Sequence, residues 1–166
     1  MMLISVIIMS SCVEPSLDYL EFTLNSGIDT TELNEPYQDP GATAKYGFKV
    51  LTVEVISNNV DVTTIGVYEI VYQATYASLT QTLKRVVTVI DETPPTLQLN
   101  PGIDTITVGT QWVDAGVTMS DNSGLAIDLV IIGEVGSIPG IYIIRYVATD
   151  VYLNQSQIER VVYVIE

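Results

Sequence analysis

Tyrosine, isoleucine and alanine recur on every second position along two stretches of the chain, residues 68–74 and 142–148. The residues on these alternate positions are Tyr68, Ile70, Tyr72 and Ala74 in the first stretch, and Tyr142, Ile144, Tyr146 and Ala148 in the second. Polar residues such as Glu69, Gln73 and Arg145 fall between them. A period of two is typical of a β-strand with one buried face, so the pattern predicts a half-buried strand in each stretch.

Runs rich in β-branched residues predict further strands at 49–56, 83–90, 127–132 and 158–165, with a shorter one at 97–99. Turn-forming residues separate them at 58–59, 65–66, 121–124 and 139–140. No stretch beyond the first dozen residues has the periodicity of a helix. Several short strands joined by regular turns predict an all-β protein built as antiparallel sandwiches.

The strand pattern occurs twice in the 166 residues. Segments 24–30, 37–43, 66–75 and 85–90 return as 99–105, 112–118, 140–149 and 160–165, an offset of 75 residues that slips to 74 only in the third segment. One register across four segments predicts two copies of one domain, at 20–91 and 96–166. Pro94 and Pro95 remove two backbone donors and stiffen the connection, so residues 92–95 are predicted as a linker.

The ordered motifs resemble those of bacterial immunoglobulin-like surface repeats, the DUF5011 type, which are related to Ig-like modules of pesticidal crystal proteins and to HYR domains. These motifs are Asp-x-Gly-Ala/Val-Thr, Gly-x-Tyr-x-Ile-x-Tyr-x-Ala-Thr, Val-Val-x-Val-Ile and the junction Asp91-Glu92-Thr93-Pro94-Pro95. The resemblance covers about residues 20–166. It implies two tandem immunoglobulin-like antiparallel β-sandwiches of about seven strands each.

Tyr72 and Tyr146 each precede an alanine by two residues, where antibody-type domains have Tyr-x-Cys. Two interpretations stay open for these tyrosines. Each hydroxyl bonds across a corner of the sandwich, or each ring is a plain core side chain.

The chain begins with eleven apolar or small residues that stop at Cys12. This is shorter than the ~20 residues that span a bilayer, and it suits the apolar region of a signal peptide. Met9-Ser10-Ser11-Cys12 resembles a bacterial lipobox, although no basic residue precedes it and Met9 replaces the preferred leucine. The resemblance implies cleavage before Cys12 and a lipid on its sulfur. Segment 1–19 is then a lipoprotein-type signal and a short tether, and the protein lies on an extracytoplasmic membrane surface. The alternatives are a cleaved signal without lipid, and an N-terminal strand or disordered leader with a free cysteine.

The composition limits the kinds of binding and catalysis that the chain can support. There is no histidine, and the single cysteine allows neither an intramolecular disulfide nor a thiolate metal cluster. The net charge of −14, from 20 acidic and 6 basic residues, argues against nucleic-acid binding and against docking on anionic lipid headgroups through charge. No pattern of paired carboxylates predicts general acid–base catalysis, so we expect no enzyme and assign no catalytic residue.

Calcium is the one cofactor that the sequence leaves open, because Ca²⁺ binds oxygen ligands such as carboxylates, amides and carbonyls. The candidate ligands stand at the domain junction and in two loops of the second copy: Asp91, Glu92, Asp121, Asn122, Asp150 and Asn154. The alternative is that these residues form turns by bonding to their own backbone.

The sequence therefore predicts a surface-tethered bacterial lipoprotein without enzymatic activity, held to the membrane by lipid on Cys12. Its Ig-like domains act as a spacer or adhesion module that contacts a surface protein or a glycan. The main alternative is a polysaccharide-binding accessory module, in which Trp112 and the ten tyrosines stack on sugars. Pairing through free strand edges stays open, and an enzyme is the third alternative.

Overall fold

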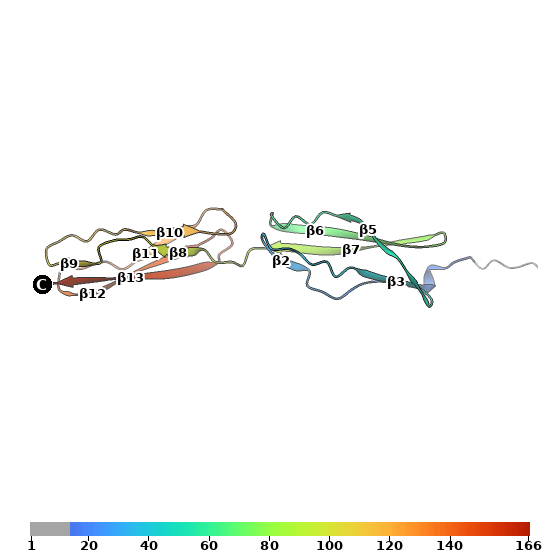
Figure 1. Cartoon of the computed structure of the whole chain (residues 1–166), viewed down its shortest axis with the longest axis horizontal. Coiled ribbons are helices and arrows are strands. Elements are labelled where there is room, and N and C mark those ends of the chain that lie inside the picture. The colour runs from blue at the N-terminus through green and yellow to red at the C-terminus, as the bar shows by residue number, and fades with distance from the viewer. Residues whose placement is uncertain (1–13) are drawn as a thin grey trace, which may run out of the picture. The chain divides into compact units, whose positions relative to one another are not determined.

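A computed structural model describes residues 14–166 of the chain, and Cys12 with the rest of the predicted signal lies outside the described residues. A short 3₁₀ turn at Leu17–Tyr19 (η1) precedes the strands (Figure 1). The strands are β1 (Leu20–Leu24), β2 (Thr30–Glu32), β3 (Ala42–Tyr46), β4 (Lys49–Leu51), β5 (Val53–Asn58), β6 (Gly66–Tyr76), β7 (Leu79–Ile90), β8 (Thr96–Leu99), β9 (Thr105–Thr107), β10 (Val117–Ser120), β11 (Asp128–Ile132), β12 (Gly140–Thr149) and β13 (Gln155–Ile165). The all-β fold class is confirmed over the described residues.

Strands β1 to β7 form two sheets, ordered β1-β3-β4 and β2-β7-β6-β5. Strands β8 to β13 form two more, ordered β10-β8 and β11-β12-β13-β9. The pairs β1–β3, β5–β6, β11–β12 and β12–β13 are antiparallel, as expected of an Ig-like sandwich. The short strand β9 departs from this pattern, because it lies parallel to β13 with Thr105 opposite Tyr163.

The single strand predicted at 49–56 is two strands that belong to different sheets. Leu51 pairs with Ala44 of β3, whereas Val53 pairs with Ala74 of β6. Both Leu51 and Val53 pack against the same hydrophobic cluster. The chain therefore changes sheets at Thr52 while keeping an apolar side chain against the core on either side of the step.

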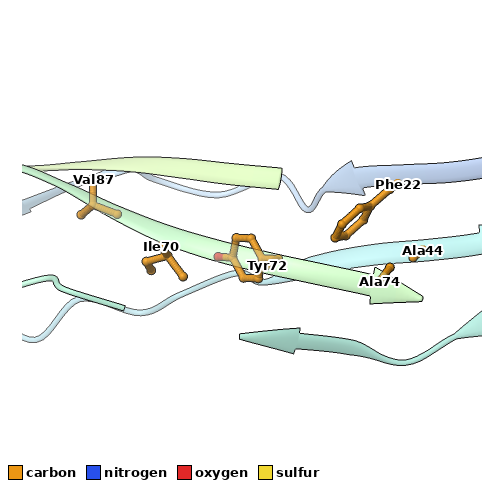
Figure 2. Close-up of a cluster of buried hydrophobic side chains, with 6 residues drawn as sticks. All are labelled: Phe22, Ala44, Ile70, Tyr72, Ala74 and Val87. Atoms are coloured by element: carbon orange, nitrogen blue, oxygen red, sulfur yellow. The ribbon is translucent and has the colours of Figure 1, made fainter. Parts of the chain in front are cut away.

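The core between the first two sheets contains six buried side chains (Figure 2). They are Phe22, Ala44, Ile70, Tyr72, Ala74 and Val87. Three of them alternate along β6, as the sequence pattern predicts, and the others come from β1, β3 and β7. Burial of these side chains, at roughly 25 cal/mol per Å² of apolar surface, is the main force that holds the two sheets together.

The later strands bury a matching set of side chains. Ile144, Tyr146 and Ala148 on β12 and Val162 and Val164 on β13 are each at most 3% exposed. The residues between them on β13 are exposed, so the strand buries one face. Both predicted half-buried strands therefore place their Tyr-Ile-Tyr-Ala faces against a core.

The chain divides into two compact units. One contains 14–29 of the described chain, Tyr37–Asp61 and Val67–Thr88, and the other contains Thr30–Pro36, Val62–Gly66 and Val89–Glu166. The domain boundaries at 91 and 96 stay a prediction. None of the helical structure between residues 14 and 166 has the length and apolar character of a membrane span.

Candidate functional site

Three of the acids predicted as calcium ligands lie together in the second unit. Asp91, Asp121 and Asp150 directly follow the ends of β7, β10 and β12, respectively. Each offers one carboxylate oxygen, and these oxygens all lie within 4.8 Å of one another. Asp91 and Asp150 are only 7% and 5% exposed, and Asp121 is half-buried. We call this group the three-aspartate cluster.

Each aspartate of the cluster is held by its own turn through one carboxylate oxygen. Oδ1 of Asp91 accepts a hydrogen bond from the backbone N–H of Thr93 (3.2 Å), and Oδ1 of Asp121 accepts one from the N–H of Ser123 (2.9 Å). Oδ1 of Asp150 accepts two, from the N–H groups of Tyr152 and Asn154 (both 2.8 Å). Such turns fix carboxylates in place before any ligand arrives.

The opposite oxygens of two aspartates have no hydrogen-bond partner. Oδ2 of Asp91 and Oδ2 of Asp121 are buried and unbonded, and so is Oδ1 of the neighbouring Asn122. Within residues 14–166, no salt bridge neutralises any member of the cluster. A buried carboxylate oxygen without a partner is costly, because burial removes the water that would solvate it.

A fourth acid, Glu32 at the end of β2, flanks the cluster and was not predicted. Its carboxylate accepts hydrogen bonds from the backbone N–H of Glu92 (3.0 and 3.1 Å), the hydroxyl of Thr93 (2.8 Å) and the side-chain amide of Asn122 (3.3 Å). The amide of Asn34 donates in turn to the backbone oxygen of Asn122 (3.0 Å). Nothing in the sequence around Glu32 predicts these hydrogen bonds, because the partners Thr93 and Asn122 are distant in the chain.

Two of the three remaining predicted ligands, Glu92 and Asn154, make other contacts. Glu92 is exposed, and its backbone N–H, rather than its carboxylate, makes the contact with Glu32. Asn154 bonds inside the cluster: its side-chain amide donates to Oδ2 of Asp150 (2.8 Å) and to the backbone oxygen of Asp91 (3.0 Å). Asn154 therefore ties the loop after β12 to the segment after β7.

Charge and burial move the pKa values of two of these acids in opposite directions. Burial raises the pKa of the Asp91 carboxyl, the hydrogen bond from Thr93 lowers it, and the negative charge of Asp121 raises it again, with a net increase. Burial also raises the pKa of Glu32, but the hydrogen bonds from Thr93, Glu92 and Asn122 bring it below its ordinary value. Between residues 14 and 166, no basic side chain forms an ion pair with these acids.

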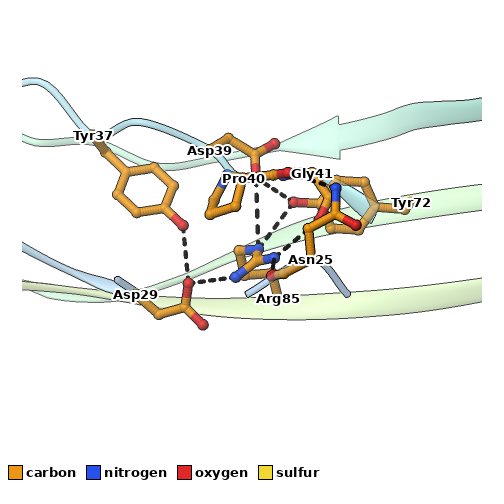
Figure 3. Close-up of polar contacts among 8 residues, drawn as sticks. All are labelled: Asn25, Asp29, Tyr37, Asp39, Pro40, Gly41, Tyr72 and Arg85. Carbon is orange, nitrogen blue, oxygen red and sulfur yellow. Dashed lines mark hydrogen bonds and ion pairs between the residues drawn. The ribbon is translucent and has the colours of Figure 1, made fainter. Parts of the chain in front are cut away.

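A buried arginine, Arg85 on β7, is the centre of a polar network in the first unit (Figure 3). Its Nη2 donates to the backbone oxygens of Asn25 (2.7 Å) and Gly41 (2.9 Å), its Nη1 bonds Asp29 (2.5 Å), and its Nε donates to the hydroxyl of Tyr72 (3.2 Å). Only 2% of the Arg85 side chain is exposed. The guanidinium therefore holds the loops that contain Asn25 and Gly41 to β7 by hydrogen bonds.

Arg160 on β13 makes the corresponding contacts in the second unit. Its Nη2 donates to the backbone oxygens of Asn100 (2.7 Å) and Gly116 (3.1 Å), and its Nη1 bonds both carboxylate oxygens of Asp104 (3.0 Å). One difference is that Nε of Arg160 has no hydrogen-bond partner and lies 3.9 Å from Asp114. The sequence shows both arginines at matching positions, but not that they are buried.

Tyr72 and Tyr146 are core side chains, and the hydroxyl of each also makes a hydrogen bond. Their rings are in the cores, at most 1% exposed, and their hydroxyls donate to carboxylates: Tyr72 to Asp39 and Tyr146 to Asp114. Each bond reaches a loop rather than the backbone of the same strand. Burial, followed by the hydrogen bond to the carboxylate, raises the pKa of each tyrosine.

An open cavity of ≈ 570 Å³ adjoins Trp112, in the second unit. Besides Trp112, its lining includes Gln111, Thr110 and Glu134. The indole Nε1 donates to the backbone oxygen of Ile103 (3.0 Å), which fixes the ring, and the side chain is half-buried. At the matching position, Tyr37 instead bonds Asp29 (3.2 Å), so this part of the surface differs between the two halves of the chain.

Comparison with known proteins shows a similarity for one part of the chain. Residues 23–89 match the family model described as bacterial surface protein, Ig-like domain. No curated protein matches the chain. A solved structure of a lipoprotein from Bacteroides thetaiotaomicron is similar at 16% identity and a TM-score of 0.36, over 87% of this chain and 80% of that chain. The match over 23–89 and the two-sheet fold support a bacterial surface Ig-like domain in this part of the chain.

The matched segment contains the whole Arg85 network but, of the carboxylate site, only Glu32. The Arg85 network therefore lies within the segment that the family model matches. The three-aspartate cluster is a separate feature of this chain, outside the segment that the family model describes.

Proposed function

We propose that the chain is a non-enzymatic bacterial surface lipoprotein whose Ig-like sandwiches serve as a spacer or adhesion module. The observation that carries this proposal is the match of residues 23–89 to an Ig-like domain of bacterial surface proteins. The net charge of −14 supports it, because a strongly acidic surface stays soluble and repels its neighbours.

The proposal includes two tandem copies of the domain. The recurrence of the arginine contacts supports this part. Arg85 reaches the backbone oxygens of Asn25 and Gly41, and Arg160 reaches those of Asn100 and Gly116, each residue 75 positions later. Two sandwiches whose loops are held by the same arginine contacts suit a repeated structural module.

The membrane anchor of the proposal is lipid on Cys12, which is tested by cell fractionation. Cys12→Ala should move the protein from the membrane fraction to the soluble one and abolish incorporation of a labelled fatty acid. Ser10→Ala, which keeps the cysteine, is the control and should leave both unchanged. Unaltered membrane retention of the Cys12→Ala protein would show that the anchor is elsewhere.

A second candidate function is carbohydrate binding, which the cavity beside Trp112 favours. A fixed indole next to the polar side chains of Gln111 and Glu134 combines a stacking face with hydrogen-bonding groups, as sugar sites require. The test is a glycan array with the Cys12→Ser chain. Binding that Trp112→Ala removes and Phe48→Ala retains would support this function, since Phe48 is a fully exposed aromatic outside the cavity lining. A blank array would leave the spacer or a protein partner.

A further inference from the structure

The three-aspartate cluster contains two carboxylate oxygens that have no hydrogen-bond partner. Asp91 is more than nine-tenths buried, yet its Oδ2 bonds to nothing. Oδ2 of Asp121 and Oδ1 of Asn122 are buried and unbonded as well. Unpaired buried acceptors in a native fold call for a partner that carries positive charge or donates protons.

The chain itself offers no such partner among residues 14–166. Every salt bridge there involves Lys84, Arg85, Arg145 or Arg160, and their partners are other acids. Like charges held a few ångströms apart in a buried place repel one another strongly, because little water screens them. A bound cation would remove both the repulsion and the unmet hydrogen-bonding capacity.

The geometry fits one ion. Ligand oxygens of Ca²⁺ lie about 2.3–2.6 Å from the ion, so two of them are at most about 5 Å apart. The oxygens of Asp91, Asp121 and Asp150 meet this limit, since all lie within 4.8 Å of one another. Hydrogen bonds from the backbone N–H groups of the turns to Oδ1 of each aspartate fix the side chains in place.

The donor atoms select the kind of ion. All are carboxylate or amide oxygens, which hard cations prefer, whereas Zn²⁺ sites use mainly histidine and cysteine. Mg²⁺ demands near-octahedral geometry at about 2.0–2.1 Å and keeps several of its waters. Three carboxylates from three separate loops suit the flexible coordination of calcium better.

We propose that Asp91, Asp121 and Asp150 bind one calcium ion, with Oδ1 of Asn122 as an additional ligand. The ion joins the segment after β7 to the loops after β10 and β12. Glu32 adds negative charge beside the site, and its carboxylate accepts a hydrogen bond from the side-chain amide of Asn122. Calcium therefore stabilises the folded arrangement of these loops, and its removal loosens them.

The test uses the full chain with Cys12→Ser, melted in about 5 mM CaCl₂ and in EDTA. This concentration exceeds the ~10⁻⁴–10⁻³ M dissociation constants of extracellular calcium modules. Calcium should raise the melting temperature by several degrees, because a ligand that binds only the folded state stabilises it. Titration calorimetry should give about one site, and Mg²⁺ at equal concentration should give a smaller shift.

Two variants keep the proposal falsifiable. Asp121→Asn retains the oxygen that accepts from Ser123 but removes a charge, so it should weaken calcium binding at least tenfold and abolish the thermal shift. Its stability in EDTA should equal or exceed that of the parent chain, because repulsion falls. Asp91→Asn should behave in the same way, and the exposed control Glu54→Gln should keep the full shift. An unchanged melting temperature and no calorimetric heat for the parent chain would overturn the proposal, as would a full shift in both aspartate variants.

Discussion

Removal of the buried guanidinium of Arg85 is the sharpest test of how the Ig-like framework is held together. Arg85→Ala deletes hydrogen bonds to Asp29, to Tyr72 and to the backbone oxygens of Asn25 and Gly41. It also leaves a cavity between β7 and two loops. The neighbouring groups cannot replace the lost hydrogen bonds. Asp29 and the two backbone oxygens are acceptors only, and the hydroxyl proton of Tyr72 is already donated to Asp39.

The magnitude follows from the burial of the arginine. Hydrogen bonds to a charged group contribute about 1.5–3 kcal/mol each, and breaking a buried ion pair from one side costs about 3–5 kcal/mol. Asp29 is 42% exposed, so water screens its attraction, and the two backbone oxygens carry much of the effect. We expect Arg85→Ala to lower the free energy of unfolding by about 3–5 kcal/mol, a large part of the roughly 5–15 kcal/mol of a typical domain.

The measurement is a urea titration followed by far-UV circular dichroism, with two comparison variants. Arg160→Ala should cost a similar amount, because Arg160 makes the corresponding bonds. Arg145→Ala is the control: Arg145 pairs with Glu159 at 2.8 Å, but 47% of its side chain is exposed, so the loss should be below about 1 kcal/mol. If Arg85→Ala lowered the free energy of unfolding no more than Arg145→Ala does, Arg85 would not be the residue that holds the two loops to β7.

Two further substitutions test packing and pH dependence. Gly27→Ala should lower the unfolding midpoint by an amount equivalent to about 1–3 kcal/mol in the same urea titration, because its Cβ would lie 2.0 Å from Cγ of Pro40; a neutral result would contradict this contact. Burial and the hydrogen bond to Asp29 raise the pKa of Tyr37 to about 12, so the fold favours the neutral phenol. Stability from this group is complete below about pH 10 and falls as the pH rises to about 12, by on the order of 1–2 kcal/mol. Tyr37→Phe should flatten the alkaline part of the stability profile, and an unchanged slope would count against the Tyr37–Asp29 bond.

The sequence pattern was informative where a strand buries one face along its whole length. The predicted strands at 68–74 and 142–148 lie inside β6 and β12, and their alternating residues line the cores. Prediction was weaker for short strands such as β2 and β9, because three residues are too few to display a period. The division of 49–56 between two sheets was also missed, since the residues on both sides of the step are apolar.

The candidate calcium ligands show the same limit at the level of a site. Turn-forming acids at positions 91, 121 and 150 are visible in the sequence as possible oxygen ligands. Their convergence depends on β7, β10 and β12 ending near one another. Glu32 could not be placed beside them from its neighbours in the chain, because its contacts with Thr93 and Asn122 arise only from the folded loops.

The amino-acid sequence by itself determined the all-β class, because the alternation of apolar residues depends only on local backbone geometry and on which face meets water. It also displayed the 75-residue recurrence, which places Arg85 and Arg160 at equivalent positions. The tertiary structure decided what those residues do. It buried two arginines against loop carbonyls and brought three aspartates within reach of one ion, since such contacts join segments whose separation in the chain conceals their proximity in space.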